Sequence, residues 1–183
     1  MPSQEKPDAI ALLKADHRKV EDLFAKFEAA KGTSKKAALA KQICTELMAH
    51  ATIEEEIFYP ACKSVVEKDL LNEAYVEHDG AKVMIAELLD SEPDADFYDA
   101  KMKVLSEEIK HHVKEEEKRS EGMFAQARAA GLDMEELGER MRRRKEELLA
   151  KFKASGLPAP QTRSFTGHKL TQSAPVEEMT ARA

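Results

Sequence analysis

A histidine and a glutamate, His50 and Glu54, stand four residues apart in a stretch with helical periodicity. On an α-helix this spacing places both side chains on one face, one turn apart. An imidazole and a carboxylate stacked in this way can hold one metal ion or two neighbouring ions. Alone, the pair is weak evidence, because most His-x3-Glu pairs are solvated neighbours on a helix surface. Here the pair falls on the apolar stripe of its segment, which favours a buried site.

The chain carries a second copy of this pattern around His112 and Glu116. In both copies the order is apolar, glutamate, apolar, histidine, glutamate at the same spacing, so two helices present the same face to one site. The register of the second copy is open, because His111 and Glu115 have the same spacing. The apolar stripe favours His112 and Glu116 and leaves His111 on the flank. Three other glutamates in these motifs are interpreted as solvated carboxylates: Glu55, Glu56 and Glu117.

Four histidines lie on the apolar stripes of four successive predicted helices: His17, His50, His78 and His112. Burying four imidazoles and two carboxylates in a core of aliphatic side chains costs several kcal/mol unless they are paired or bound to metal. A core selected only for stability would use leucine at these positions. Carboxylate oxygens and imidazole nitrogens suit iron, manganese or zinc, and no thiolate joins this set. Glu21 follows His17 by one turn and is a further candidate ligand, although it leaves the stripe.

Four helices of about five to seven turns must position these residues. The first is predicted from Asp8 to Gly32, and the second from residue 33 or 34 to about Tyr59, where Pro60 ends or kinks it. Asp69 is predicted to cap the third, and the fourth begins near Tyr98 after a turn at residues 91–94. Long helices joined by short links predict an all-α, up-down-up-down four-helix bundle over residues 8–130.

Beyond the bundle, the acidic sequence of residues 133–136 predicts a capped helix over 131–156. This helix carries a basic run from Arg140 to Lys145, interpreted as a solvated face because Glu136–Arg140 and Glu139–Arg143 are favourable i,i+4 pairs. Docking of a protein partner through this helix is the alternative. Residues 157–183 are rich in Pro, Ser, Thr and Gln without periodicity, which predicts a disordered tail.

Composition narrows the class of protein. Of the 183 residues 42% are hydrophobic, none is tryptophan, and the net charge is −6, which argues against nucleic acid as a partner. No segment reaches the ~18 apolar residues of a membrane span, so we expect a cytoplasmic protein that has no membrane partner. Cys44 and Cys62 are the only cysteines. They would lie roughly 24 Å apart along one helix, too far for a disulfide, which fits a reducing compartment.

The motifs together resemble the hemerythrin-like, or HHE cation-binding, domain over roughly residues 8–130. The similarity lies in helix order, ligand type and spacing, in Asp16-His17, His50-x3-Glu54 followed by Glu-Glu-Ile-Phe-Tyr-Pro, Glu77-His78, and His111-His112-x-x-Glu115-Glu116. The resemblance implies a bundle with a non-haem, oxo-bridged di-iron centre, although the sequence cannot exclude manganese or zinc. It further implies terminal ligands at His17, His50, His78 and His112, with Glu54 and Glu116 bridging the ions.

The chain departs from the oxygen carriers of that family on the third helix. Those carriers have His-x3-His there, whereas here Lys82 follows His78 by four residues. Roughly two coordination positions would then stay open, against one in a five-histidine site. A more open centre favours reaction over reversible oxygen storage. Lys82 is interpreted as a surface lysine with a snorkelling stem, the alternative being a hydrogen-bond donor to a bound ligand. Gly80 is interpreted as a small packing residue, with a local bulge as the alternative.

Three functions follow from these expectations. The first is a non-haem di-iron protein that binds or senses O₂, NO, redox state or iron, with a small diatomic molecule or peroxide as its partner. Oxygen binding and stress response are the roles it implies. The second is a di-iron oxidoreductase acting on peroxide or NO, or a ferroxidase. The third is a helical interaction module in which the metal is structural.

Overall fold

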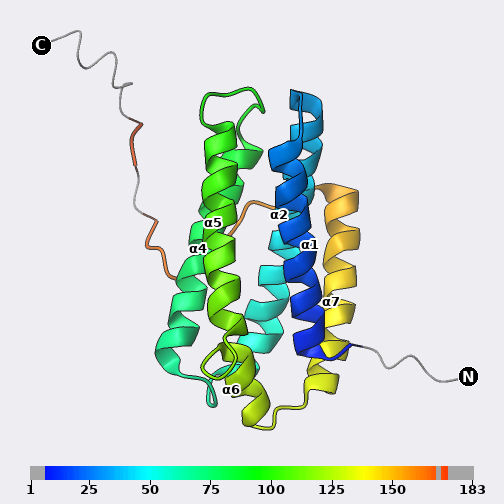
Figure 1. The fold of residues 1–183 in the computed structure, drawn as a ribbon, viewed down its shortest axis with the longest axis vertical. Helices are drawn as coiled ribbons and strands as arrows, with labels where there is room; N and C mark the ends of the chain where they lie inside the picture. Colours follow the sequence, from blue (N-terminus) through cyan, green and yellow to red (C-terminus); the bar gives the residue numbers. More distant parts are fainter. Residues whose placement is uncertain (1–6, 168–169, 173–183) are drawn as a thin grey trace, which may run out of the picture.

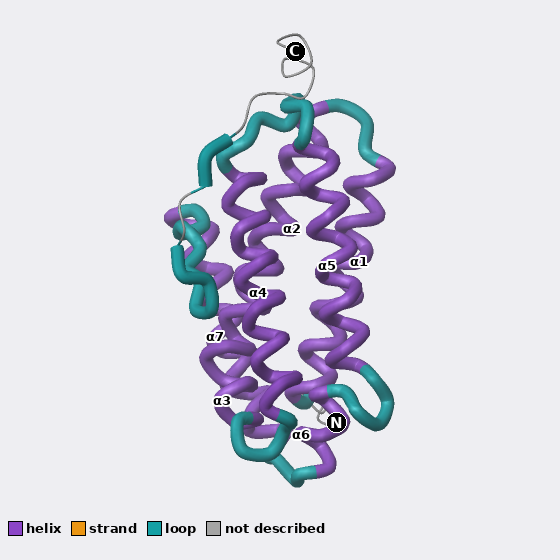
Figure 2. The backbone as a smooth tube through the Cα atoms, turned by 90° about the vertical axis from the view of Figure 1, so that its left-hand side faces the viewer, coloured by secondary structure: helices purple, strands orange, loops and turns teal. Residues whose placement is uncertain are grey.

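The computed structural model describes residues 7–167 and 170–172 of the chain. Within these residues every regular element is helical and no strand occurs (Figures 1 and 2). The elements are α1 (Ala9–Ala29), α2 (Thr33–Ile53), the π-helical turn η1 (Glu54–Phe58), α3 (Tyr59–Cys62), α4 (Lys68–Leu89), α5 (Tyr98–Glu117), α6 (Met123–Ala129) and α7 (Met134–Ser155).

The helices α1, α2, α4 and α5 run side by side along the long axis of the molecule (Figure 1). Figure 1 shows the chain reversing direction at the short links of residues 30–32 and 90–97, so that α1 and α2 are antiparallel neighbours, as are α4 and α5. The short α3 and α6 lie at one end, and α7 runs alongside α1 and α2 on the outside of the bundle (Figures 1 and 2). The prediction of an all-α, bundle-type fold is confirmed.

Helix ends follow local chemistry that the sequence largely indicated. The Asp8 side chain accepts a hydrogen bond from the Ala11 N–H at 2.8 Å, and Asp133 accepts one from the Glu136 N–H at 2.9 Å. Both are N-caps of the expected kind. The cap predicted at Asp69 is wrong, because α4 already begins at Lys68. Asp69 lies in the first turn of α4, where its negative charge interacts favourably with the helix dipole.

The second predicted helix does not end at Tyr59. It widens into η1, where the Tyr59 N–H donates to the Glu54 carbonyl oxygen, the i to i+5 bond of a π-helix. It then continues as α3 to Cys62. Pro60 does not interrupt this path because it lies in the first turn of α3, where a missing N–H is tolerated. The extra residue in the turn rotates the following side chains, so that Phe58 and Tyr59 are both fully buried.

The core between the helices contains two thiols. Cys44 and Cys62 are both free and buried, which confirms that they do not pair.

Gly80 does not mark a close helix approach, because a Cβ added there would meet nothing within 4 Å. In the described part of the chain no helix combines the length and apolar character needed to cross a membrane.

Candidate metal centre

Six polar side chains meet inside the bundle. Each bundle helix contributes a histidine, and the glutamates come from η1 and α5. None is more than 6% exposed. The structure therefore brings together the six residues that the stripes indicated, which are His17, His50, Glu54, His78, His112 and Glu116.

The histidines form two pairs that face each other through their Nε2 atoms. His17 Nε2 lies 3.1 Å from His50 Nε2, and His78 Nε2 lies 3.2 Å from His112 Nε2. One pair joins α1 to α2 and the other joins α4 to α5. The centre thus has two halves, each supplied by two neighbouring helices.

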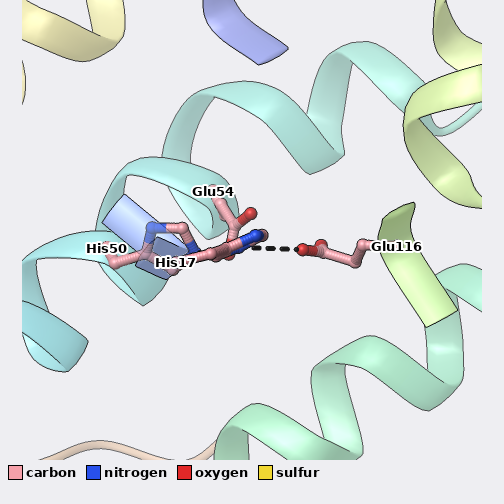
Figure 3. A group of neighbouring side chains, drawn as sticks. All are labelled: His17, His50, Glu54 and Glu116. Atoms are coloured by element: carbon pink, nitrogen blue, oxygen red, sulfur yellow. Dashed lines mark hydrogen bonds and ion pairs between the residues drawn. The ribbon is translucent and has the colours of Figure 1, made fainter. Parts of the chain in front are cut away.

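The two glutamates connect these halves. Glu54 Oε2 lies 3.2 Å from His50 Nε2 and 3.3 Å from His78 Nε2. Glu116 Oε2 lies 3.4 Å from His17 Nε2, the contact drawn in Figure 3, and 3.5 Å from His112 Nε2. Each carboxylate therefore touches one histidine of each pair. Glu54 Oε1 and Glu116 Oε2 are buried without a hydrogen-bond partner, which leaves unused acceptor capacity within the buried cluster.

On the outer side, every histidine ring donates its Nδ1–H to a carboxylate. Such bonds fix the tautomer and turn Nε2 inward, as carboxylates bonded to the outer nitrogen do for metal-bound histidines. Glu55 and Glu117 belong to this set, so their interpretation as solvated carboxylates is wrong. The acceptors are Glu117 for His17 at 2.8 Å, Asp16 for His50 at 3.3 Å, Glu55 for His78 at 3.1 Å and Glu77 for His112 at 2.8 Å.

These outer carboxylates are in turn held by basic groups. Glu117 accepts from Arg18 at 2.6 Å, and Asp16 accepts from Lys145 of α7. Glu55 accepts from Lys82 at 2.6 Å and from Arg163 at 2.9 Å. Three of the four rings are therefore supported by a chain of histidine, carboxylate and lysine or arginine, which restricts their rotation.

Electrostatics without metal place protons inside the site. Burial and the neighbouring His50 lower the pKa of His17 to about 4. Burial opposes charge on His50, but the charges and hydrogen bonds of Glu54 and Asp16 outweigh it and raise its pKa to about 10. Burial and the charge of Glu54 raise the pKa of Glu116 to about 8. These shifts favour a proton on His50 and another on Glu116 when no metal is bound.

Tyr59 is a member of the site that the sequence reasoning missed. Its hydroxyl donates to Glu116 Oε1 at 3.0 Å and lies 3.2 Å from His78 Nε2 and 3.5 Å from Glu54 Oε2. Its ring stacks on His78 with centroids 5.3 Å apart. Burial and the two glutamates raise its pKa well above the usual value, so it stays protonated. A stripe drawn with the α-helical period does not include Tyr59. The π-helical turn before Tyr59 changes the rotation of the side chains and places it on the inward face.

Three weaker candidates lie outside the cluster. His111 is 59% exposed and lies 3.4 Å from Glu77, while Glu115 pairs with Lys118 on the surface. Glu21 pairs with Arg18 at 3.4 Å instead of reaching inward. His111 and Glu115 each precede an inward residue by one position, which rotates them by about 100° around the helix. The register with His112 and Glu116 inside is the one that the structure adopts.

Lys82 is not a surface residue, so that interpretation is wrong. It is 6% exposed, and its ammonium lies 2.6 Å from Glu55 Oε1 and 3.4 Å from Asp79 Oδ1, which together offset its burial. Its stem borders a cavity of about 30 Å³ beside the histidines. Aliphatic residues form the other wall of this cavity: Val20, Leu47, Ala81, Ile85, Ile109 and Val113.

Comparison with known proteins gives three findings. The family model described as hemerythrin HHE cation binding domain matches residues 8–126. A protein from Nostoc sp. named "DNA nickase" is 28% identical over 106 residues, covering 58% of this chain and 30% of that protein, so the chain spans less than a third of its length. A crystal structure of an HHE cation-binding-domain protein from Mycobacterium kansasii superposes with a TM-score of 0.69 at 24% identity. It covers 82% of this chain and 95% of that one, and shows a shared fold.

Proposed function

The chain belongs to the hemerythrin HHE cation-binding domain family, and we propose that its buried cluster holds two metal ions, with iron the first candidate and manganese or zinc the alternatives. One observation carries this proposal. Two pairs of histidine Nε2 atoms face each other across the core, and a carboxylate touches one member of each pair.

The donor set fits two cations. Because each Nδ1–H is directed outward, two inward Nε2 lone pairs repel each other at 3.1–3.2 Å unless a proton or cation lies between or beside them. Nitrogens bound to one ion at about 2.1 Å lie about 3 Å apart when their bonds meet at right angles. The unpartnered oxygens of Glu54 and Glu116 supply the negative charge that such ions require.

We further propose that the protein binds or senses a small ligand such as O₂ or NO, or responds to redox state or iron. A bound iron pair supplies one-electron chemistry and open positions for such a ligand. The cavity beside the histidines supports the size of the ligand, since about 30 Å³ suffices for one or two water-sized molecules. Its aliphatic wall favours an uncharged diatomic over an ion.

An oxidoreductase acting on peroxide or NO, or a ferroxidase, is the second candidate. The observation that favours it is the Tyr59 hydroxyl, a proton donor within 3.5 Å of three of the six side chains. An interaction module with a structural metal is less favoured. Lys145 of α7, the helix that would dock a partner, instead bonds Asp16, the carboxylate that contacts His50. A cytoplasmic location and the absence of nucleic-acid partners remain predictions.

The test is the metal content and absorption spectrum of the full chain beside His50→Ala and His111→Ala. Because His50 lies inside the cluster and His111 is exposed on its flank, we expect about two ions in the wild type and in His111→Ala. His50→Ala should lose at least one ion. Equal metal content in all three proteins, or none after reconstitution, would overturn the proposal. Turnover of peroxide or NO by the loaded wild type would favour the enzyme over the sensor.

A further inference from the structure

The segment after α7 crosses the molecule and binds the opposite side of the bundle. In Figure 1 it runs, in orange, from the end of α7 to the outer side of α4. We call residues 157–167 the strap. Asp79 Oδ2 on α4 accepts three hydrogen bonds from it, from the Arg163 N–H at 2.8 Å, the Ser164 N–H at 2.6 Å and the Ser164 hydroxyl at 2.7 Å. The disorder predicted for residues 157–183 did not anticipate these contacts, and residues 168–169 and 173–183 of that segment lie outside the described part of the chain.

The Arg163 side chain reaches the support of the metal centre. Its Nε donates to Glu55 Oε2 at 2.9 Å, and its guanidinium lies 5.9 Å from the centroid of the Tyr75 ring. The other oxygen of Glu55 accepts from His78 Nδ1 at 3.1 Å and from Lys82 at 2.6 Å. A single carboxylate therefore separates the strap from a histidine of the site.

Charge balance makes this contact consequential. Asp79 is fully buried and Glu55 is 8% exposed, and Lys82 is the one other cation that bonds to both among the described residues. The Arg163 side chain is 57% exposed, so it covers this group from the solvent side, and without it the two carboxylates would share the Lys82 ammonium. A buried charge that loses its partner is strongly destabilised unless it moves or water enters. Either change would free the Glu55 oxygen that orients His78.

We propose that Arg163 is a positioning residue for the half of the metal centre formed by His78 and His112, acting through Glu55, and that the strap excludes water from that half. This inference rests on the proposed binding of two ions. The strap lies outside the residues 8–126 that the family model matches.

The neighbouring glutamate provides a matched control. Arg144 of α7 binds Glu56 with Nε–Oε2 and Nη2–Oε1 distances of 2.7 and 3.0 Å. Glu55 and Glu56 are adjacent in the sequence and each is bound by an arginine, but within the described residues only Glu55 contacts a histidine. Removal of Arg144 thus deletes a neighbouring arginine–glutamate pair, with a more exposed carboxylate, and leaves the contacts of Glu55 in place.

The experiment measures release of Co²⁺ from the loaded full chain into excess EDTA, with the visible absorption of the protein-bound Co²⁺ recorded. In Arg163→Ala we expect the ion in the half formed by His78 and His112 to leave at least about tenfold faster than in the wild type. Loss of a group that orients a metal ligand lowers metal affinity about 10–100-fold. The absorption of that ion should shift as His78 reorients. Arg163→Lys, which keeps the positive charge, should release this ion more slowly than Arg163→Ala but faster than the wild type. Arg144→Ala should release both ions at the wild-type rate.

Several outcomes would overturn the inference. Wild-type release from Arg163→Ala contradicts it, as does equal acceleration of both ions, or the same change in Arg144→Ala. If Arg163→Ala does not fold by circular dichroism, Arg163→Lys and Ser164→Ala carry the test, and wild-type release in both contradicts the inference. A wild type that binds fewer than two Co²⁺ would instead overturn the proposed function on which the inference depends.

Discussion

The Tyr59 hydroxyl is positioned to act on both halves of the site, because it bonds Glu116 and lies beside His78 and Glu54. In Tyr59→Phe the ring and its stacking on His78 remain while the proton donor is lost. If the protein turns over peroxide, we expect this variant to keep about two ions and lose at least about tenfold in rate, since a positioned proton donor contributes about 10²–10⁴-fold. Unchanged turnover in a fully loaded variant would exclude Tyr59 as the proton donor.

The sequence predicted the histidines and glutamates that line the centre more successfully than the carboxylates that contact those histidines from outside. Apolar stripes place His112 inside and His111 outside because successive residues on a helix point about 100° apart. The same reasoning could not separate Glu55 from Glu56. Glu55 is buried only because His78, Lys82 and Arg163 converge on it from other segments. Contacts between distant segments leave no periodic signal in either partner.

At the scale of the helical elements, η1 explains the error at the end of the second helix. An α-helical period of 3.6 places Ile57 on the same face as Glu54, but Ile57 is only partly buried, whereas Phe58 and Tyr59 are fully buried. Insertion of one residue into a turn is a local choice that packing stabilises, and π turns of this kind often occur at functional sites. Helix existence and order were therefore predictable, while the rotation of side chains after residue 54 was not.

Two glycines test the packing of these elements. A Cβ on Gly138 of α7 would lie 2.7 Å from the Ala9 backbone nitrogen, whereas a Cβ on Gly80 of α4 would meet nothing within 4 Å. We expect Gly138→Ala to lower the free energy of unfolding by about 1–3 kcal/mol, since backbone must shift. Gly80→Ala should raise it by about 1 kcal/mol through helix propensity. Urea unfolding of both variants checks this, and a stabilised Gly138→Ala would contradict close packing of α7 on the start of α1.

At the scale of the whole molecule, metal binding and folding should be coupled. The cluster collects donors from α1, α2, η1, α4 and α5, so an ion bound there stabilises only the folded chain. We expect a chelator to lower the melting temperature of the loaded protein by several degrees, measured by circular dichroism or calorimetry. His50→Ala, which should hold fewer ions, should show a smaller drop in melting temperature than the wild type when chelator is added. Identical curves for the wild type in both conditions would count against ions bound in the core.

The C-terminal part of the chain was predicted as a helix and a tail without a connection to the bundle site. In the structure, Lys145 of α7 bonds Asp16, the partner of His50, and Arg163 bonds Glu55, the partner of His78. The sequence indicated the helix through its cap and its basic run, but not which carboxylates those cations would meet. Residues beyond the matched family domain therefore support one histidine in each half of the centre.

The two buried cysteines give the molecule internal reporters of its own opening. Burial raises the pKa of both Cys44 and Cys62 to about 12, so the thiolate that reacts with alkylating reagents is scarce in the native state. Alkylation of these thiols then requires a transient separation of helices, so the alkylation rate reports how often the helices separate. Cys62 lies at the end of α3 and Cys44 within α2, so their separate rates would distinguish fraying of one end from opening of the bundle.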